Sequence, residues 1–399
     1  MSIRAAVGQS QLSTSFDAGR QAAASALDGL NGASPGLAIV FGTSEYDQED
    51  LINGVREIVG DIALSGCSGE GIIVRNQSLE CDYAVGVMLL SSTTLMFETF
   101  LLEEYGKDPG ACGGELARLI GAKDDVIGLL IFPDGLVGNC TRFLAELESN
   151  LDVPVLVSGG TSADGMAFEK TFQYGDDGVI SHGLAAVLIR GEGRLELAVS
   201  HGCSPIGLER TVTREQDGWV HEIDDQRAWS VFKEYLDGDP EDLNADGIVH
   251  LCIGKPIDPV DGQGYGSYVI HTPLALDKDS GALFFPSGGL STGDKIRMTR
   301  RDPQRIKASA RACADRILDQ GSGQSPALVL QFDCAGRGSV LFGACAAEEI
   351  VQPLQEALGN TTPWLGFHTY GEIAPVSGRL LYHNYTVALC ALYEGTSAG

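Results

Sequence analysis

The sequence has few basic residues and few aromatic residues, and it lacks long apolar runs. Lys and Arg number 27 against 54 Asp and Glu, and the formal net charge is -27. This charge repels phosphate backbones and anionic lipid surfaces, which excludes nucleic acid and membranes as main partners. No segment approaches the roughly 18 consecutive apolar residues of a membrane helix, and the N-terminus lacks the apolar centre of a secretory signal. The acidity itself indicates solubility.

Common catalytic and metal-binding motifs are also missing. The chain has no G-x-S-x-G elbow, no Walker loop, no H-E-x-x-H and no C-x-x-C-H motif for covalent haem. Its ten cysteines show no C-x-x-C pair, and none is spaced with a histidine as in a zinc finger. We therefore expect a cytoplasmic protein with reduced thiols, in which metal-dependent hydrolysis and nucleotide chemistry are disfavoured.

Short apolar runs of strand length alternate with helical stretches along the chain, and this alternation predicts an α/β protein. The runs lie at 37–41, 127–132, 153–158, 184–189 and 326–332. Helices are predicted to begin after Asp17, at Asp108-Pro109 and at Asp302-Pro303, because Asp caps free N–H groups and Pro suits a first helical turn.

The same order of elements recurs three times after these helix starts. Each copy continues with a strand ending in Phe41, Phe132 or Phe332, a polar turn and a second helix. A glycine-rich turn follows at 65–71, 158–165 or 366–375, and an outgoing apolar strand closes the copy. The pattern favours internal duplication of β-α-β-α-β-β units. A different segment at 205–293 separates copies two and three. We therefore predict two domains, 1–220 and 221–399, each of mixed sheets covered by helices.

Polar residues directly after the recurring strands are the candidate ligand-binding residues, because open α/β sheets bind ligands beyond the carboxyl ends of their strands. Thr161, Ser162, Asp164, Asp333 and His383 are neighbouring polar residues. The predicted site consists of Cys67, Ser68, Glu70, Cys334, Arg337, His368, Thr369, Tyr370, Glu372 and Asn384.

Each candidate also has a structural interpretation. Cys67 and Cys334 are nucleophiles or small buried thiols. Arg337 either clamps a carboxylate ligand or pairs with Asp333. His368 either contacts a ligand or forms a hydrogen bond within its turn. Glu372 and the His383-Asn384 pair are equally suited to bracing that turn.

Several of these segments together resemble the FIST family of bacterial signal-transduction sensors. The resemblance is carried by GCSGEGI and VSGGTSADG in the first half and by FDCAGRG, GFHTYGEIAP and HNYT in the second. It covers nearly the whole chain, in the order of the family's N-terminal and C-terminal domains. It implies an intracellular module that senses small molecules such as amino acids. Some similar proteins are described as haem-binding nitric oxide sensors that act on histidine kinases.

The leading hypothesis is therefore a cytoplasmic small-ligand sensor that acts through a separate signalling partner such as a histidine kinase. One alternative is a nitric oxide sensor with a b-type haem, whose iron would be bound by His368. A second alternative is a thiol-dependent enzyme that uses Cys67 or Cys334 with help from Arg337 or His368. The absence of a catalytic motif favours a sensor over an enzyme.

Overall fold

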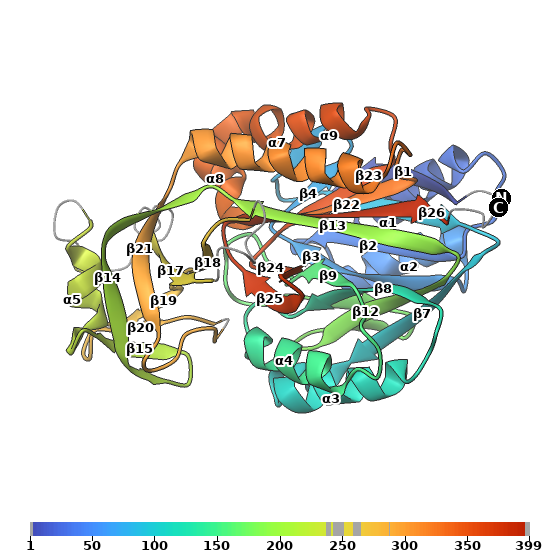
Figure 1. Cartoon of the computed structure of the whole chain (residues 1–399). Coiled ribbons are helices and arrows are strands. Elements are labelled where there is room, and N and C mark those ends of the chain that lie inside the picture. Colours follow the sequence, from blue (N-terminus) through green and yellow to red (C-terminus); the bar gives the residue numbers. More distant parts are fainter. Residues whose placement is uncertain (1–2, 237–240, 242–250, 258–264, 287, 396–399) are drawn as a thin grey trace.

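The computed structural model describes residues 3–236, 241, 251–257, 265–286 and 288–395. The fold is mixed α/β, as the sequence predicts. Three six-stranded sheets form the body, and helices cover their outer faces. A fourth, eight-stranded antiparallel sheet lies to one side, on the left in Figure 1.

The chain builds the body from three units with the same order of elements. The first contains β1 (Arg4–Ser10), α1 (Ser15–Gly29), β2 (Leu37–Thr43), α2 (Gln48–Val59), β3 (Ala63–Gly69), β4 (Gly71–Val74), β5 (Gln77–Leu79) and β6 (Val85–Ser91). The second contains β7 (Leu95–Leu102), α3 (Pro109–Ile120), β8 (Val126–Pro133), α4 (Cys140–Asn150), β9 (Val157–Gly160), β10 (Gln173–Gly175), β11 (Gly178–Ile180) and β12 (Leu184–Gly191). The third contains β13 (Gly193–His201), α7 (Pro303–Gln320), β22 (Leu328–Cys334), α8 (Ser339–Phe342), α9 (Gln352–Leu358), β23 (Trp364–Thr369), β24 (Glu372–Val376), β25 (Arg379–His383) and β26 (Thr386–Glu394).

The third unit is interrupted after β13 by the fourth sheet, which we call the insert. It contains β14 (Cys203–Gln216), β15 (Trp219–Ile223), β16 (Gln226–Arg227), α5 (Ala228–Lys233), β17 (Leu251–Pro256), β18 (Tyr268–His271), β19 (Ala275–Asp277), β20 (Ala282–Phe284) and β21 (Lys295–Arg301). Strand β13 pairs with β26, the last strand of the described chain.

The domain boundary that the sequence predicts near residue 220 stays a prediction.

Each unit contributes a hairpin to the sheet of another unit. The β4–β5 hairpin pairs with β23 of the third unit, the β10–β11 hairpin with β3 of the first, and the β24–β25 hairpin with β9 of the second. This cyclic exchange gives the body an approximate threefold arrangement. The glycine-rich turns are the crossovers between units, so their polar residues lie at contacts between units.

A cluster of phenylalanine rings fills the centre of this arrangement. The equivalent residues Phe41, Phe132 and Phe332 have ring centroids 5.3 to 6.4 Å apart. Phe367 packs against all three, most closely at 4.5 Å from Phe41. Such contacts between buried aromatic rings add to the stabilisation from the apolar area that they bury. The landmark phenylalanines of the sequence are thus the shared core of the three units.

A glycine recurs at the same point of the third strand of each unit, which pairs in parallel with the second. A Cβ atom on Gly66, Gly159 or Gly366 would collide with the carbonyl oxygen of the neighbouring strand. Any larger residue would push the two strands apart. These three glycines, the first of each predicted turn, therefore lie within strands, and the chain turns only after them.

The helix starts were predicted correctly in two of three cases. The side chains of Asp108 and Asp302 accept hydrogen bonds from N–H groups of the first helical turn, and each is followed by a proline. The prediction for the first helix was wrong, because α1 begins at Ser15 with Thr14 as N-cap and Asp17 inside the first turn. The predicted helix over AAEEIVQPLQEAL divides into a π-helical turn, Ala347–Val351, and α9.

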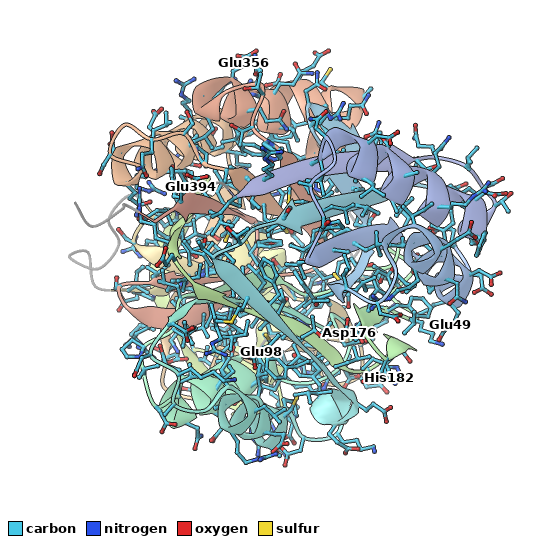
Figure 2. The ribbon with its side chains drawn as sticks, turned by 90° about the vertical axis from the view of Figure 1, so that its right-hand side faces the viewer. Glu49, Glu98, Asp176, His182, Glu356 and Glu394 are labelled. Carbon is cyan, nitrogen blue, oxygen red and sulfur yellow. The ribbon has the colours of Figure 1, made fainter. Side chains whose placement is uncertain are left out.

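Acidic side chains lie on the outside of the layers. Figure 2 labels Glu49, Asp176, Glu356 and Glu394, all of which are exposed. The charge excess is thus carried largely by hydrated surface groups, which favours solubility. Within the described part of the chain, no helix combines the length and the apolar character needed to cross a membrane.

Candidate functional site

Most of the predicted site residues lie at the carboxyl ends of β3, β22 and β23 or in the loops that follow them, whereas Glu372 begins β24 and Asn384 lies between β25 and β26. The structure places six of them in two groups with neighbouring residues, and Cys67, Cys334, His368 and Asn384 belong to neither group. We call the first group the axial cluster, consisting of Ser68, Glu70, Thr161, Asp164, Thr369 and Tyr370. We call the second group the arginine cluster, consisting of Arg301, Asp333, Arg337 and Glu372.

Hydrogen bonds between units hold the axial cluster together. Asp164 accepts a hydrogen bond from the Tyr370 hydroxyl at 2.5 Å, and its carboxylate also accepts from the backbone N–H groups of residues 168–170. Thr369 Oγ1 donates to the carbonyl of Thr161 at 2.7 Å, and Ser68 Oγ donates to the carbonyl of Ala163 at 2.8 Å. These bonds join the three units at the crossovers.

Glu70 is the exception within the axial cluster. Its backbone N–H donates to the carbonyl of His368, but its Oε2 has no hydrogen-bond partner among the described residues. Burial, together with the nearby carboxylates of Glu80, Asp164 and Glu45, raises the pKa of Glu70 to about 8. The side chain is therefore largely protonated at neutral pH, and a neutral carboxyl costs less to bury than a charged one.

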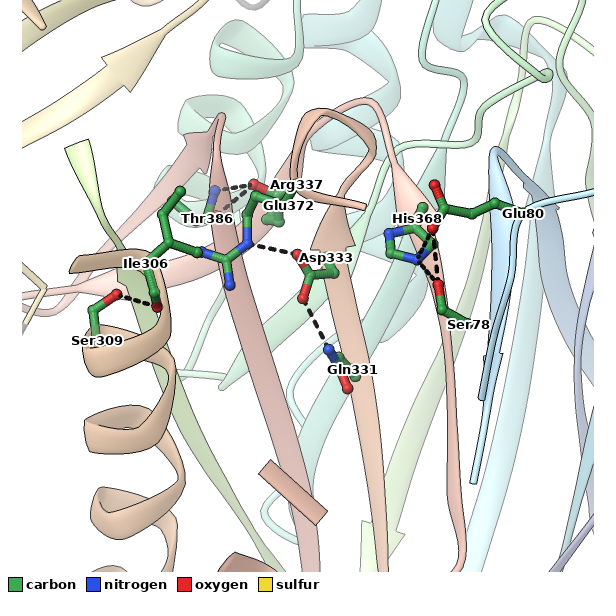
Figure 3. A network of polar contacts seen from close by, with 10 residues as sticks. All are labelled: Ser78, Glu80, Ile306, Ser309, Gln331, Asp333, Arg337, His368, Glu372 and Thr386. Carbon is green, nitrogen blue, oxygen red and sulfur yellow. Dashed lines mark hydrogen bonds and ion pairs between the residues drawn. The ribbon is translucent and has the colours of Figure 1, made fainter. Parts of the chain in front are cut away.

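The arginine cluster lies on the helix side of the last sheet, at the end of β22. Arg337 is fully buried, and its Nε donates to Asp333 Oδ1 at 2.7 Å, as Figure 3 shows. Asp333 Oδ2 accepts from Gln331 Nε2 at 2.8 Å. The predicted pairing of Arg337 with Asp333 is therefore present. It uses one of the three guanidinium nitrogens, and the other two have no hydrogen-bond partner within the described residues.

Arg301 brings a second buried guanidinium group to the same place. It is the last residue of β21 in the insert and is 5% exposed. Its guanidinium carbon lies 4.4 Å from the centroid of the Tyr385 ring, and NH1 lies against Gly336, the residue before Arg337. None of its three nitrogens has a hydrogen-bond partner among the described residues. In this cluster, five guanidinium nitrogens are thus buried without a hydrogen-bond partner among the described residues.

Glu372 completes the arginine cluster. It is fully buried, and burial raises the pKa of its carboxyl well above the usual range, although Thr386 donates two hydrogen bonds to its Oε2. Arg337 is paired with Asp333, whereas the guanidinium group of Arg301 has no hydrogen-bond partner among the described residues. A buried charge without a partner is costly, and a bound anion would pair with it.

His368 is held by the hairpin of the first unit. Its side chain is fully buried, and Nε2 lies 2.7 Å from Ser78 Oγ and 3.5 Å from Glu80 Oε1 (Figure 3). A b-type haem needs a ring nitrogen that can reach iron and an apolar slot for the macrocycle. Here Nε2 lies between Ser78 and Glu80, and Nδ1 has no hydrogen-bond partner among the described residues. The ring is fully buried beside these polar side chains, and this setting does not fit the apolar slot that a haem needs.

The two candidate nucleophiles are packed thiols. Cys67 is fully buried beside Phe41 of the central core, and Cys334 packs against Cys203, Cys252 and Tyr385. Burial raises the pKa of both thiols well above the ordinary value. A buried thiol with a raised pKa is a poor nucleophile.

Asn384 and His383 connect the last turn to its surroundings. Asn384 Nδ2 donates to the carbonyl of Tyr370 at 3.1 Å, and Asn384 Oδ1 accepts from the backbone N–H of Thr272 in the insert. His383 Nε2 lies 2.9 Å from the carbonyl of Ala374. Among the predicted candidates, Asn384 thus links the third unit directly to the insert.

Sequence reasoning missed Arg301, Ser78 and Glu80. Arg301 directly precedes the Asp302-Pro303 helix start, and this position was the one sequence signal that placed it between a strand and a helix. Its partnership with Arg337 depends on packing between the insert and the body, which no local pattern indicates. Ser78 and Glu80 contact His368 because the β4–β5 hairpin of the first unit pairs with β23, and no sequence pattern indicates this pairing.

The fold is thus a mixed α/β protein of three units with exchanged hairpins, in which two polar clusters lie where the units meet. The chain belongs to the FIST family: the FIST N domain matches residues 36–226 and the FIST C domain matches residues 228–375. This confirms the resemblance seen in the sequence. FIST domains are associated with signal transduction and the sensing of small ligands.

Relatives of similar length are found in mycobacteria. An uncharacterized protein of Mycobacterium bovis is 27% identical over 399 residues, which cover 98% of this chain and 99% of the relative. One of Mycobacterium tuberculosis is 28% identical over 401 residues, covering 98% of this chain and all of the relative. A cyanuric acid hydrolase from A. caulinodans aligns at 10% identity with a TM-score of 0.34 over 99% of this chain and all of that structure, a similarity too low to support an argument.

Proposed function

We propose that the protein is a cytoplasmic signal-transduction sensor that binds a small anionic molecule, such as an amino acid or another small carboxylate, at the arginine cluster. The observation that carries this proposal is the pair of buried guanidinium groups, Arg301 and Arg337, with five nitrogens lacking hydrogen-bond partners in the described part of the chain. Guanidinium groups match carboxylates in both geometry and charge.

A cavity of about 520 Å³ lies near the cluster, although none of the four cluster residues lines it, so a ligand would have to pass from this cavity to the buried guanidinium groups. Its lining includes Cys203, which is the cross-strand partner of Arg301, and Arg305 and Ser309 on α7. His201 also lines it, and burial lowers the pKa of this histidine to about 3, so that the ring is neutral. The volume lies within the roughly 300 to 1,000 Å³ of typical ligand pockets.

Ligand binding would connect the insert to the body, because Arg301 ends the insert strand β21 and Arg337 belongs to the third unit. A ligand held by both side chains favours conformations in which these two parts lie close together. A separate signalling protein, such as a histidine kinase, would then respond to the position of the insert.

The test is a thermal-shift screen of the purified protein against amino acids, small mono- and dicarboxylates and their uncharged amides. A ligand that binds the folded state raises the melting temperature with its concentration. We expect carboxylates to raise it and the amides to have little effect. Arg301→Met should remove the response, whereas Arg311→Met, a control at an exposed arginine of α7, should retain it.

Failure of every acid to shift the melting temperature would contradict anion sensing at this site. An equal rise of the melting temperature in the wild type and in Arg301→Met would show that the ligand binds outside the arginine cluster.

A further inference from the structure

A second cavity lies on the other side of the β24–β25 hairpin and has a different chemistry. Its volume is about 360 Å³, and we call it the junction cavity. Three parts of the molecule meet there: α4 of the second unit, β17 and β18 of the insert, and the β24–β25 hairpin of the third unit. None of the arginine-cluster residues lines it.

Apolar side chains form most of the cavity wall. Leu144 of α4 is 1% exposed and Val269 of β18 is 6% exposed, and Ile257 and Leu380 complete the apolar lining. Burying apolar ligand surface here would contribute about 25 cal/mol per Å² before the costs of binding. The cavity therefore suits a hydrocarbon group.

The charged residues of the lining are basic, although acidic residues outnumber basic ones two to one in the chain. Among the described residues that line the cavity, none is acidic. Lys255 Nζ already donates to Asp294 at 2.7 Å and to the carbonyl of Gly289 at 3.1 Å. Arg379 is exposed and forms no ion pair with any described residue. Arg379 is therefore the cation that can meet an anionic head group.

We propose that the junction cavity binds a small apolar carboxylate, whose hydrocarbon part packs against Leu144, Val269 and Leu380 and whose carboxylate pairs with Arg379 at the solvent side. This site is separate from the arginine cluster, so the proposal does not depend on the proposed function. A ligand bound there contacts the insert and two units at once.

Calorimetric titration with octanoate tests this site, with 1-octanol as a probe of the same chain length without charge. We expect the wild type to bind octanoate, and 1-octanol to bind at least about tenfold more weakly because it cannot pair with Arg379. The variant Arg379→Glu should weaken octanoate binding by at least about tenfold, since it replaces an attraction by a repulsion. Arg4→Glu, at an exposed arginine of β1, makes the same charge change outside the cavity and should leave binding unchanged.

The variant Arg301→Met distinguishes binding at the junction cavity from binding at the arginine cluster. If octanoate occupies the junction cavity, this variant should bind it like the wild type. If octanoate binding is lost in Arg301→Met and kept in Arg379→Glu, the carboxylate sits at the arginine cluster and the proposal is wrong. Absence of octanoate binding to the wild type, or equal binding of octanoate and 1-octanol, would also overturn it.

Discussion

The axial cluster and the arginine cluster lie at neighbouring strand ends, yet they differ in how fully their most buried charged side chains are hydrogen-bonded. In the axial cluster, Asp164 accepts hydrogen bonds from Tyr370 and from three backbone N–H groups, so its charge is well compensated. In the arginine cluster, Arg301 has three nitrogens without partners among the described residues. Buried polar groups normally have partners, so the difference separates a cluster that stabilises the fold from one that is suited to binding.

Breaking the ion pair of the arginine cluster should have the largest effect on stability. The change Arg337→Met leaves Asp333 charged and buried without its partner, which should lower the free energy of unfolding by about 3 to 5 kcal/mol. Chemical denaturation measures this loss. The double variant Arg337→Met with Asp333→Leu should recover most of it, because it removes both charges of the pair and leaves neither of them buried without the other. If the single variant is as stable as the wild type, the pair does not stabilise the fold as described.

Weakening the axial cluster should cost less. In Asp164→Asn the side chain keeps its shape, but one of its two acceptor oxygens becomes an NH2 donor. Two of the hydrogen bonds are then lost and the others become neutral, so unfolding should become easier by at least about 2 kcal/mol. If the axial cluster only stabilises the fold, Asp164→Asn should still bind carboxylates like the wild type in the thermal-shift screen. Glu169→Gln, at an exposed position in the same loop, is the matched control and should change neither property.

The pH dependence of stability should identify Glu70. Its pKa is raised to about 8 in the folded state from an ordinary value of 4.5, so the folded protein holds the proton more tightly than the unfolded chain does. The stability linked to this proton is therefore present at low pH and is lost as pH rises from 4.5 to 8. Between pH 5 and pH 8 the melting temperature of Glu70→Gln should change less than that of the wild type. Parallel pH profiles of the two proteins would show that Glu70 does not carry this proton.

The smallest effect is expected at the buried thiols, which should not react with an alkylating reagent at neutral pH. Cys81 and Cys345 are exposed, whereas Cys67 and Cys334 are buried with raised pKa values. Alkylation followed by peptide mass spectrometry should label the exposed pair and leave the buried pair unmodified. Rapid labelling of Cys334 in the folded protein would instead support a reactive thiol.

Local features of the fold were predictable because they depend on nearby residues. Asp108 and Asp302 cap their helices through N–H groups two or three positions away, which a sequence pattern can indicate. The exchange of hairpins was not predictable, because alternating apolar residues indicate a strand but not the sheet that it joins. For the same reason, the sequence did not predict the hydrogen bond from Thr369 of the third unit to Thr161 of the second unit.

The candidate site was predictable only as a set of residue types at strand ends. Arg337 and Glu372 were identified because they directly follow apolar strands. Arg301 comes from the insert, and the pKa of Glu372 is raised because packing buries its carboxyl. Burial and contacts between distant segments therefore decide the chemistry of this site, and neither property is encoded in a short motif.

The most direct test of the account is the melting temperature of the wild type and Arg301→Met, each measured with and without a carboxylate that binds the wild type. Without ligand, we expect Arg301→Met to be at least as stable as the wild type, because an unpaired buried charge is removed. With saturating ligand, the wild type should become the more stable protein, so the order reverses. If Arg301→Met is much less stable without ligand and the ligand raises both melting temperatures equally, Arg301 is a structural residue and the arginine cluster is not the sensing site.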